Sequence, residues 1–494
     1  MSLATNNEVY VQTLNPIEQK ARNGYDRMAV LVPWAANSSY ETAQDQLWLL
    51  ASRYSATMTR LIDLWPMLGG VISKIDDEYG TLVSRYHVDA SVDAKHMLVQ
   101  WVNQDQGAQT WEELTASVGE DYFLPWQGTA STTVSIHPVT VLVTFSPTCT
   151  VLGFSFHQAL FDPRSMCQFS SEFIRLTSLE AIVSSPVVPR CRGRSYIDTL
   201  SFGHEGLARR DFQSRSRRSM FPCFDFGASM PKWEPVRLVS RRVVVNLDKI
   251  VAMASAQTGP YERSGSRGGV MRPTFMQLAS YGMLVSALMA LVLVRSRLTS
   301  QSALNVPSRI RLNFVQSGAS VISKDEQYMG NSSVITTALL DPKALFGLSG
   351  HQMTNMVAIG QRSTIEDLEH VQRIISEATN RVNRQFVAEY VALKCVFPPG
   401  EEREAYERGL SGGTLVFEDW MGAAKEPAGI PYSEMDELPQ VIPADSYATE
   451  PKVVILPRVD FDEASGRRCF VWFCEQADVV NRAMTRLYDE GWIF

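Results

Sequence analysis

Apolar side chains recur at helical spacing in several segments of the chain. In residues 43–68 they return every three or four positions, and a proline and two glycines close the segment. Residues 162–176 are predicted as a second helix by the same pattern. Residues 365–396 are predicted as one long amphipathic helix, because their apolar side chains fall on a single face. That face is formed by Ile365, Leu368, Val371, Ile375 and Val382.

Shorter apolar runs between turn residues predict strands. Residues 139–145 and 151–156 form one such pair, separated by a Ser-Pro-Thr turn. Residues 236–247 are a strand followed by a helix. Residues 452–457 and 469–473 form a second pair around a Ser-Gly turn, and a closing helix follows them. Strands and helices therefore alternate in both halves of the chain, which is typical of a mixed α/β protein.

Residues 275–294 carry no charge and match the length of about 20 residues that a membrane-spanning helix needs. The segment starts after Thr274, which is suited to cap a helix, and ends before Arg295. A helix packed on all sides inside a large domain has the same composition. We expect a buried helix, with a membrane span as the alternative, because nothing else in the sequence points to lipid.

Composition places the chain among ordinary globular proteins. Its 494 residues are 45% hydrophobic and 20% charged, which is enough for at least two domains with their own cores. With 46 basic and 53 acidic residues the net charge is −7, so nothing in the charge suggests a nucleic-acid or polybasic membrane partner, and we expect neither. The seven scattered cysteines favour a reducing compartment. The first residues lack the pattern of a signal peptide, so we expect a cytoplasmic monomer.

Six short segments stand in order along nearly the whole chain, namely residues 14–19 (LNPIEQ), 64–70 (LWPMLGG), 154–162 (FSFHQALFD), 305–309 (NVPSR), 328–333 (YMGNSS) and 453–458 (VVILPR). Taken together they resemble the BAHD family of CoA-dependent acyltransferases. The family patterns that they match include L-S-P-x-D-Q near the start, the catalytic H-x-x-x-D-G, N-V-R-S-R and Y-F-G-N. Each segment alone is a weak signal, but the shared order is specific, and it extends to the fungal branch that acylates secondary metabolites.

The resemblance implies two similar mixed-sheet α/β domains of the chloramphenicol acetyltransferase-like type, with a channel between them. We expect an N-terminal domain in residues 1–200, a crossover in 201–235 and a C-terminal domain in 236–494. Acyl-CoA is then a cosubstrate that enters the channel opposite a small-molecule acceptor. No tightly bound cofactor and no metal are expected.

The resemblance also implies roles for the motif residues. The motif histidine is the general base, a role that suits imidazole because its pKa lies near neutrality. The motif aspartate holds the turn by pairing with an arginine, which here predicts a pair between Asp162 and Arg309. Of the second family signature, D-F-G-W-G, only Asp436 is a remnant.

The catalytic motif departs from the family pattern, because four residues instead of three separate His157 from Asp162, and Pro163 replaces the glycine. Alignment on the aspartate puts Gln158 in the position of the base. Strand alternation agrees, since Phe154, Phe156 and Gln158 then share one face and His157 the other. A glutamine amide cannot act as a base near neutral pH. The alternative alignment keeps His157 catalytic with a one-residue bulge in the turn.

Three functions follow. The first is an O-acyltransferase of secondary metabolism, which transfers an acyl group, expected to be acetyl, from CoA to a hydroxyl of a small metabolite. The second is a repurposed scaffold for a thioester-independent cyclisation, elimination or isomerisation. The third is a catalytically silent partner. Binding of a CoA thioester separates the first from the other two.

Overall fold

A computed structural model gives the fold of the chain. The residues that it describes are 9–19, 24–33, 40–75, 82–87, 97–101, 136–146, 149–177, 221–225, 237–257, 275–299, 309–322, 330–342, 365–396, 401–410, 413–420, 440–443, 450–462 and 466–493. The predicted crossover lies outside them, apart from residues 221–225. Asp436 lies outside them as well.

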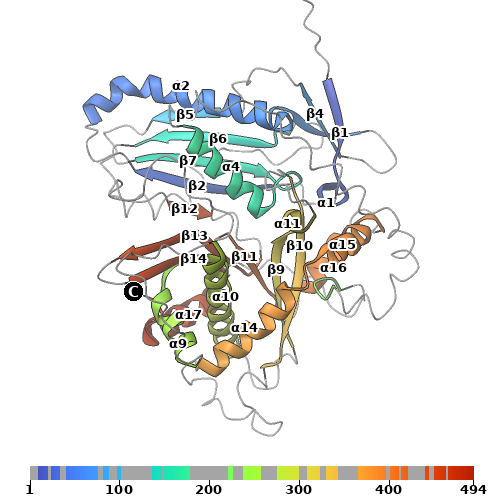
Figure 1. Ribbon diagram of the computed structural model, residues 1–494, viewed down its shortest axis with the longest axis vertical. Coiled ribbons are helices and arrows are strands. Elements are labelled where there is room, and N and C mark those ends of the chain that lie inside the picture. Colours follow the sequence, from blue (N-terminus) through green and yellow to red (C-terminus); the bar gives the residue numbers. More distant parts are fainter. Residues whose placement is uncertain are drawn as a thin grey trace, which may run out of the picture.

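The first half of the chain is built around a five-stranded sheet (Figure 1). Two helices, α2 (Tyr40–Leu64) and α4 (Pro163–Leu176), pack on the same face of it. These helices and the β6–β7 pair lie where the hydrophobic pattern predicts them. In order across the sheet the strands are β12 (Gln440–Pro443), β2 (Tyr25–Pro33), β7 (Cys149–His157), β6 (Val139–Phe145) and β5 (Met97–Trp101).

A three-stranded sheet stands beside this one. Its strands, in spatial order, are β1 (Val9–Thr13), β4 (Leu82–His87) and β3 (Val71–Lys74), with α1 (Pro16–Gln19) after β1 and the short helix η1 (Pro66–Gly69) before β3. The LNPIEQ segment caps α1, because Asn15 Oδ1 accepts the backbone N–H groups of Ile17 and Glu18. The Glu18 carboxylate accepts the N–H of Asn15 in return at 2.9 Å. The first family-like segment thus has a structural role here.

The second half is built around a six-stranded sheet covered on one face by four helices. These helices are α9 (Leu247–Gln257), α10 (Phe275–Leu298), α14 (Ile365–Thr379) and α17 (Ala477–Asp489). Across the sheet the strands are β10 (Ser333–Leu340), β9 (Ile310–Ser317), β11 (Leu415–Asp419), β13 (Lys452–Asp462), β14 (Gly466–Gln476) and β8 (Leu238–Asn246). A smaller group of helices lies beyond β10 and comprises α11 (Ala319–Ile322), α15 (Arg384–Val396) and α16 (Glu401–Leu410).

The uncharged segment 275–294 forms the central helix of the second half. Between Tyr281 and Leu298, 94% of the residues are buried inside the protein, although the helix is long and apolar enough to cross a membrane. Helix α10 contacts α14 and α17 on its sides and β13 and β11 below. The prediction of a buried helix between the second sheet and other helices is confirmed.

The prediction of one long helix over residues 365–396 is wrong. The segment forms α14 and α15, and the break falls at residues 380–383. Asn383 begins the second helix, because its Oδ1 accepts the backbone N–H of Phe386 at 2.9 Å. The two helices also pack in different places, α14 on α10 and β10, and α15 on α1 and α11. A single straight helix cannot reach both.

The two halves share a hydrophobic core. Val454, Leu456, Trp472 and Cys474 of the second sheet pack in the same cluster as residues of β6, β7, α2 and α4. Their neighbours Val453, Ile455, Val471 and Phe473 point to the opposite face, toward α10. Strand β12 adds a second connection, because it comes from the C-terminal part of the chain and pairs with β2. Figure 1 shows it between the halves.

Candidate active site

The turn between β7 and α4 carries the motif residues. Asp162 caps the first turn of α4, since its Oδ1 accepts the backbone N–H of Ser165 at 2.7 Å. Pro163 follows in the first helical position, where a missing N–H costs nothing. The replacement of the family glycine by proline therefore suits a turn that leads directly into a helix.

The same turn is bound to the Y-F-G-N-like segment of the second half. The Asp162 Oδ2 atom accepts the hydroxyl of Ser332 at 2.9 Å and its backbone N–H at 3.2 Å. The Ser165 hydroxyl donates to the carbonyl of Gly330 at 2.8 Å. Asn331 Nδ2 donates to the backbone carbonyl of Gln158 at 2.7 Å. Two segments that are distant in sequence thus meet where the halves join.

The expected pair between Asp162 and Arg309 is not present. Arg309 is exposed just before β9, and within the described part of the chain no ion pair joins it to Asp162. Both oxygens of the buried Asp162 carboxylate already accept hydrogen bonds from Ser165 and Ser332. The backbone N–H of Ser165 and the hydroxyl of Ser332 therefore hold the Asp162 turn in place, the role that was expected of Arg309.

The register of β7 with β2 places His157, and a hydrogen bond to Asp26 places Gln158, on opposite sides of the first sheet. Phe156 lies opposite Asp26 of β2, and its ring packs against Phe169 of α4, on the side of the shared core. The side chain of Gln158 is on this side, because its Nε2 donates to Asp26 Oδ1 at 2.7 Å. His157 lies opposite Tyr25, so its ring is on the other face. Which of the two is catalytic stays a prediction.

His157 is almost fully buried, with 1% of its surface exposed. Tyr25 packs edge-on against the imidazole at 5.1 Å between ring centroids, and the Nδ1 atom accepts the backbone N–H of Ala159 at 3.2 Å. Burial lowers the pKa of His157 to about 4, so the ring is neutral at pH 7. Because Nδ1 accepts a hydrogen bond, the proton of the neutral ring is on Nε2. To act as a base, His157 has to give up the Ala159 bond, either so that Nδ1 itself takes the proton or because a change of tautomer moves the lone pair to Nε2.

The buried His157 is expected to destabilise the protein in acid. The unfolded chain takes up a proton near pH 6.5 and the folded chain only near pH 4, so the free energy of unfolding falls as the pH drops through that window. The full loss is about 3 kcal/mol. Urea unfolding of wild type and His157→Asn at pH 7 and pH 4.5 measures it, and the variant should lose less stability.

The matched control for this prediction is His370→Asn, since His370 on α14 is only half-buried and shares an exposed contact with Arg373. It should lose as much stability in acid as the wild type does. An equal acid loss in all three proteins would contradict the buried, neutral state of His157.

The place where the β7–α4 turn of the first half meets residues 330–332 of the second half is the junction of the two halves. A cluster of buried charges lies on the second sheet close to it. Lys452 Nζ is 3.0 Å from Glu418 Oε1 and 3.6 Å from Glu450 Oε1, and all three residues are less than 10% exposed. Burial alone lowers the pKa of the Lys452 ammonium. The carboxylates of Glu418, Glu450 and Asp26 outweigh this, so the pKa of Lys452 lies above its ordinary value. Asp26 is thus within electrostatic range of the cluster.

Comparisons with known proteins identify the architecture. No protein-family model matches the chain, and a search of curated proteins finds no relative. Solved structures do match it over nearly its full length. TRI101 of F. sporotrichioides, complexed with coenzyme A and T-2, has a TM-score of 0.62 at 12% identity, with 98% of each chain covered. TRI3 trichothecene 15-O-acetyltransferase from Fusarium sporotrichioides has a TM-score of 0.61 at 11% identity, covering 99% of this chain and 96% of its own.

Vinorine synthase is a third match, with a TM-score of 0.54 at 14% identity, covering 98% of this chain and 93% of its own. These proteins are BAHD-type acyltransferases. The chain shares the fold of these three proteins. At such identities the shared property is the fold, and it confirms the predicted arrangement of mixed-sheet α/β halves.

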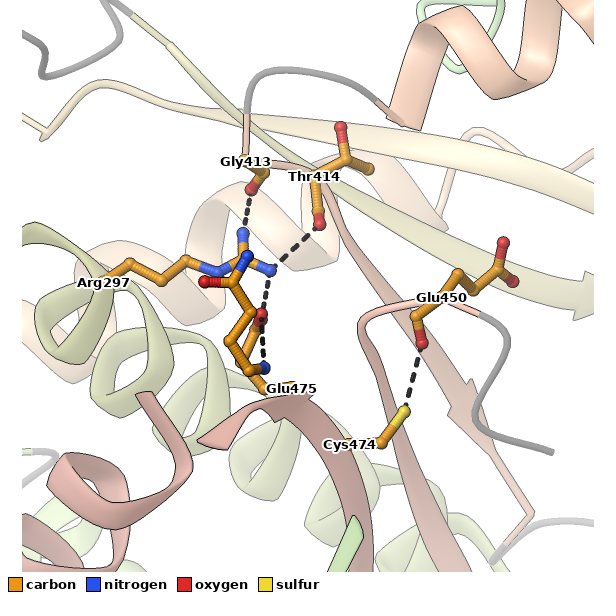
Figure 2. A network of polar contacts seen from close by, with 7 residues as sticks. Arg297, Gly413, Thr414, Glu450, Cys474 and Glu475 are labelled. Carbon is orange, nitrogen blue, oxygen red and sulfur yellow. Dashed lines mark hydrogen bonds and ion pairs between the residues drawn. The ribbon is translucent and has the colours of Figure 1, made fainter. Parts of the chain in front are cut away.

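Gly413 and Thr414, just before β11, have a structural role in this fold. The guanidinium of Arg297 donates to the carbonyls of Gly413 and Thr414 and pairs with Glu475, as Figure 2 shows. Gly413 has a φ of 93°, which favours glycine over other residues. The described part of the chain contains no cluster of His, Cys, Asp and Glu side chains that could hold a metal ion.

The sequence patterns did not point to Asp26 or to the cluster around Lys452. Asp26 is the second residue of β2, ahead of the apolar run of that strand, and its link to Gln158 depends on the pairing of β2 with β7. Lys452 starts a strand that was predicted, yet nothing local indicates that its partners are Glu418 and Glu450. A carboxylate at the start of a buried strand was the available signal for Asp26.

Proposed function

We propose that the protein is an O-acyltransferase that transfers an acyl group, acetyl in the first instance, from CoA to a hydroxyl of a small metabolite. The observation that carries the proposal is the BAHD-type fold, shared over nearly the whole chain with an acetyltransferase and with a protein crystallised with coenzyme A. A cytoplasmic monomer in a fungal secondary-metabolite pathway is part of the proposal.

In this proposal the reaction takes place where the β7–α4 turn meets residues 330–332. The acceptor oxygen attacks the thioester carbonyl, the bond between carbon and sulfur breaks, and the acceptor proton passes through a base to the CoA sulfur. Transfer is direct, with no acyl-enzyme intermediate and no metal. The hydrogen bonds of Asp162 and Asn331 keep the turn in place while the substrates bind.

A second candidate is a thioester-independent cyclisation, elimination or isomerisation on the same scaffold. It is favoured by one observation, namely that glutamine instead of histidine lies on the junction side of the turn. A silent partner is the remaining alternative. Neither requires a CoA thioester.

Calorimetric titration with acetyl-CoA tests the proposal. We expect saturable binding, and acetyl-CoA at about 100 times its Kd should raise the free energy of unfolding by about 2.7 kcal/mol. Release of the CoA thiol from acetyl-CoA should exceed the rate without enzyme, and a chelator should not change it. Binding of neither CoA nor acetyl-CoA at millimolar concentration would rule out acyl transfer and leave the second candidate and the silent partner.

A further inference from the structure

Strand β1 is an open edge of the three-stranded sheet, on the outside of the first half (Figure 1). It pairs with β4 in an unbroken antiparallel register from Val9 to Thr13. Alternate residues of such a strand direct their backbone N–H and C=O groups away from the partner. Within the described part of the chain, these outward groups of β1 make no hydrogen bond.

Several other sheet edges are closed in ways that β1 lacks. On the far side of the same small sheet, Ile72 exchanges two backbone hydrogen bonds with Ile136, at 2.7 and 3.4 Å. In the six-stranded sheet, the edge strand β8 carries two arginines, and its Asn246 donates to the backbone carbonyl of Trp492. Strand β12 ends in Pro443. Charges and prolines protect edges from pairing, and the sequence of β1, VYVQT, has neither.

The side chains of β1 are exposed on both faces of its sheet. Tyr10 is 45% exposed and Val11 is 58% exposed, and their side chains point to opposite faces. Tyr10 stacks on Tyr86 of β4 with 5.9 Å between the ring centroids, and the rest of its ring is open to an apolar side chain. An open backbone edge beside exposed aromatic and β-branched side chains is what the addition of a strand requires.

A cation on the Val11 face defines the charge that fits this edge. Arg85 of β4 lies opposite Val11 and is exposed. Among the residues that the structure describes, no carboxylate pairs with it. Neighbouring strands are about 4.8 Å apart, so a strand added to β1 lies roughly 10 Å from β4. Extended arginine and glutamate side chains together span that distance, so an acidic residue of the added strand can reach Arg85.

We propose that β1 binds an extended segment of a partner protein as a fourth strand of the small sheet. The segment carries apolar or aromatic side chains on the Tyr10 face and acidic side chains on the Arg85 face, in alternation. A second copy of this chain does not fit, because its own β1 has no acidic residue to place beside Arg85. The interaction is independent of the proposed acyl transfer.

The probe is a capped and fluorescently labelled peptide of eight residues in which valine and glutamate alternate. Fluorescence anisotropy should show saturable binding to the full chain, and the peptide should slow amide hydrogen exchange in residues 9–13. The same peptide with lysine in place of glutamate should bind roughly 5-fold more weakly, the effect of one exposed ion pair. Equal binding of the two peptides, or of neither, would overturn the proposal.

Charge reversal at Arg85 tests which residue selects the peptide. Arg85→Glu should invert the preference, so that the lysine peptide binds more tightly than the glutamate peptide. Lys74→Glu, at an exposed position at the end of β3, is the matched control and should keep the preference of the wild type. An unchanged preference in Arg85→Glu would show that this face does not read the charge of the partner.

Methylation of the peptide nitrogens tests the pairing itself. An added strand uses one edge, so its hydrogen-bonded residues are either all valines or all glutamates. Methylation of one set should abolish binding, and methylation of the other should leave it unchanged. Equal affinity of both methylated peptides would mean docking without strand pairing. Sedimentation velocity covers the remaining occupant, because a concentration-dependent dimer without peptide binding would assign the edge to a second copy and overturn the proposal.

Discussion

Replacing Arg297 by methionine is expected to lower the free energy of unfolding by about 3–5 kcal/mol, the usual cost of removing one partner from a buried pair. Arg297 lies near the end of α10, and its Nε donates to Glu475 Oε2 at 2.9 Å. Its other nitrogens bind Glu475 and the carbonyls of Gly413 and Thr414 (Figure 2). The substitution leaves a carboxylate that is 2% exposed without this cation. Equilibrium denaturation with urea measures the change.

Two variants serve as controls for Arg297→Met. Arg373→Met breaks an exposed pair with Glu377 on α14 and should cost less than about 1 kcal/mol. The double variant Arg297→Met/Glu475→Leu removes the stranded charge and should recover part of the loss. A single variant no less stable than Arg373→Met would show that Arg297 does not stabilise the link between α10, β11 and β14.

Lys452→Met is expected to have a loss of similar size, about 3–5 kcal/mol. Glu418 and Glu450 are each within 4 Å of the Lys452 ammonium, so the variant leaves two buried carboxylates beside each other without their cation. Lys452 lies on the same face of β13 as Val454 and Leu456, which pack against the first half of the chain. We therefore expect the variant to weaken the packing between the two halves as well. Urea denaturation again measures the loss.

The double variant Lys452→Met/Glu418→Gln tests the electrostatic origin of this effect. It removes one of the two repelling charges and should be more stable than Lys452→Met alone. Equal stability of the single and double variants would mean that lost packing of the lysine chain, and not charge, causes the change.

Local patterns predicted most of the elements around the site. The apolar run at 275–294, the β6–β7 pair and the helix after Asp162 follow from spacing, since burial and periodicity are properties of neighbouring residues. The break at 380–383 was missed because apolar positions continue at helical spacing past Asn383, and its role as a cap depends on where α15 packs.

The candidate site was predictable only in part. Alternation along β7 correctly separated Gln158 from His157, because successive side chains of a strand point to opposite faces. The partner of Asp162 was not predictable, since the resemblance points to Arg309 and the serine that replaces it lies elsewhere in the chain. Asp26 was missed for the same reason. Pairing between strands that are distant in sequence has no local signal.

Strand β12 sets an order for folding during synthesis. The edge of β2 that β12 covers is formed early in the chain, but its partner is made only when the ribosome reaches Gln440. Until then β2 has an open row of backbone donors and acceptors, which is the kind of edge that other chains pair with. The N-terminal half expressed alone keeps that edge and lacks Val454, Leu456 and Trp472 of its own core. Chaperone capture of nascent chains should therefore continue until the C-terminal strand has emerged.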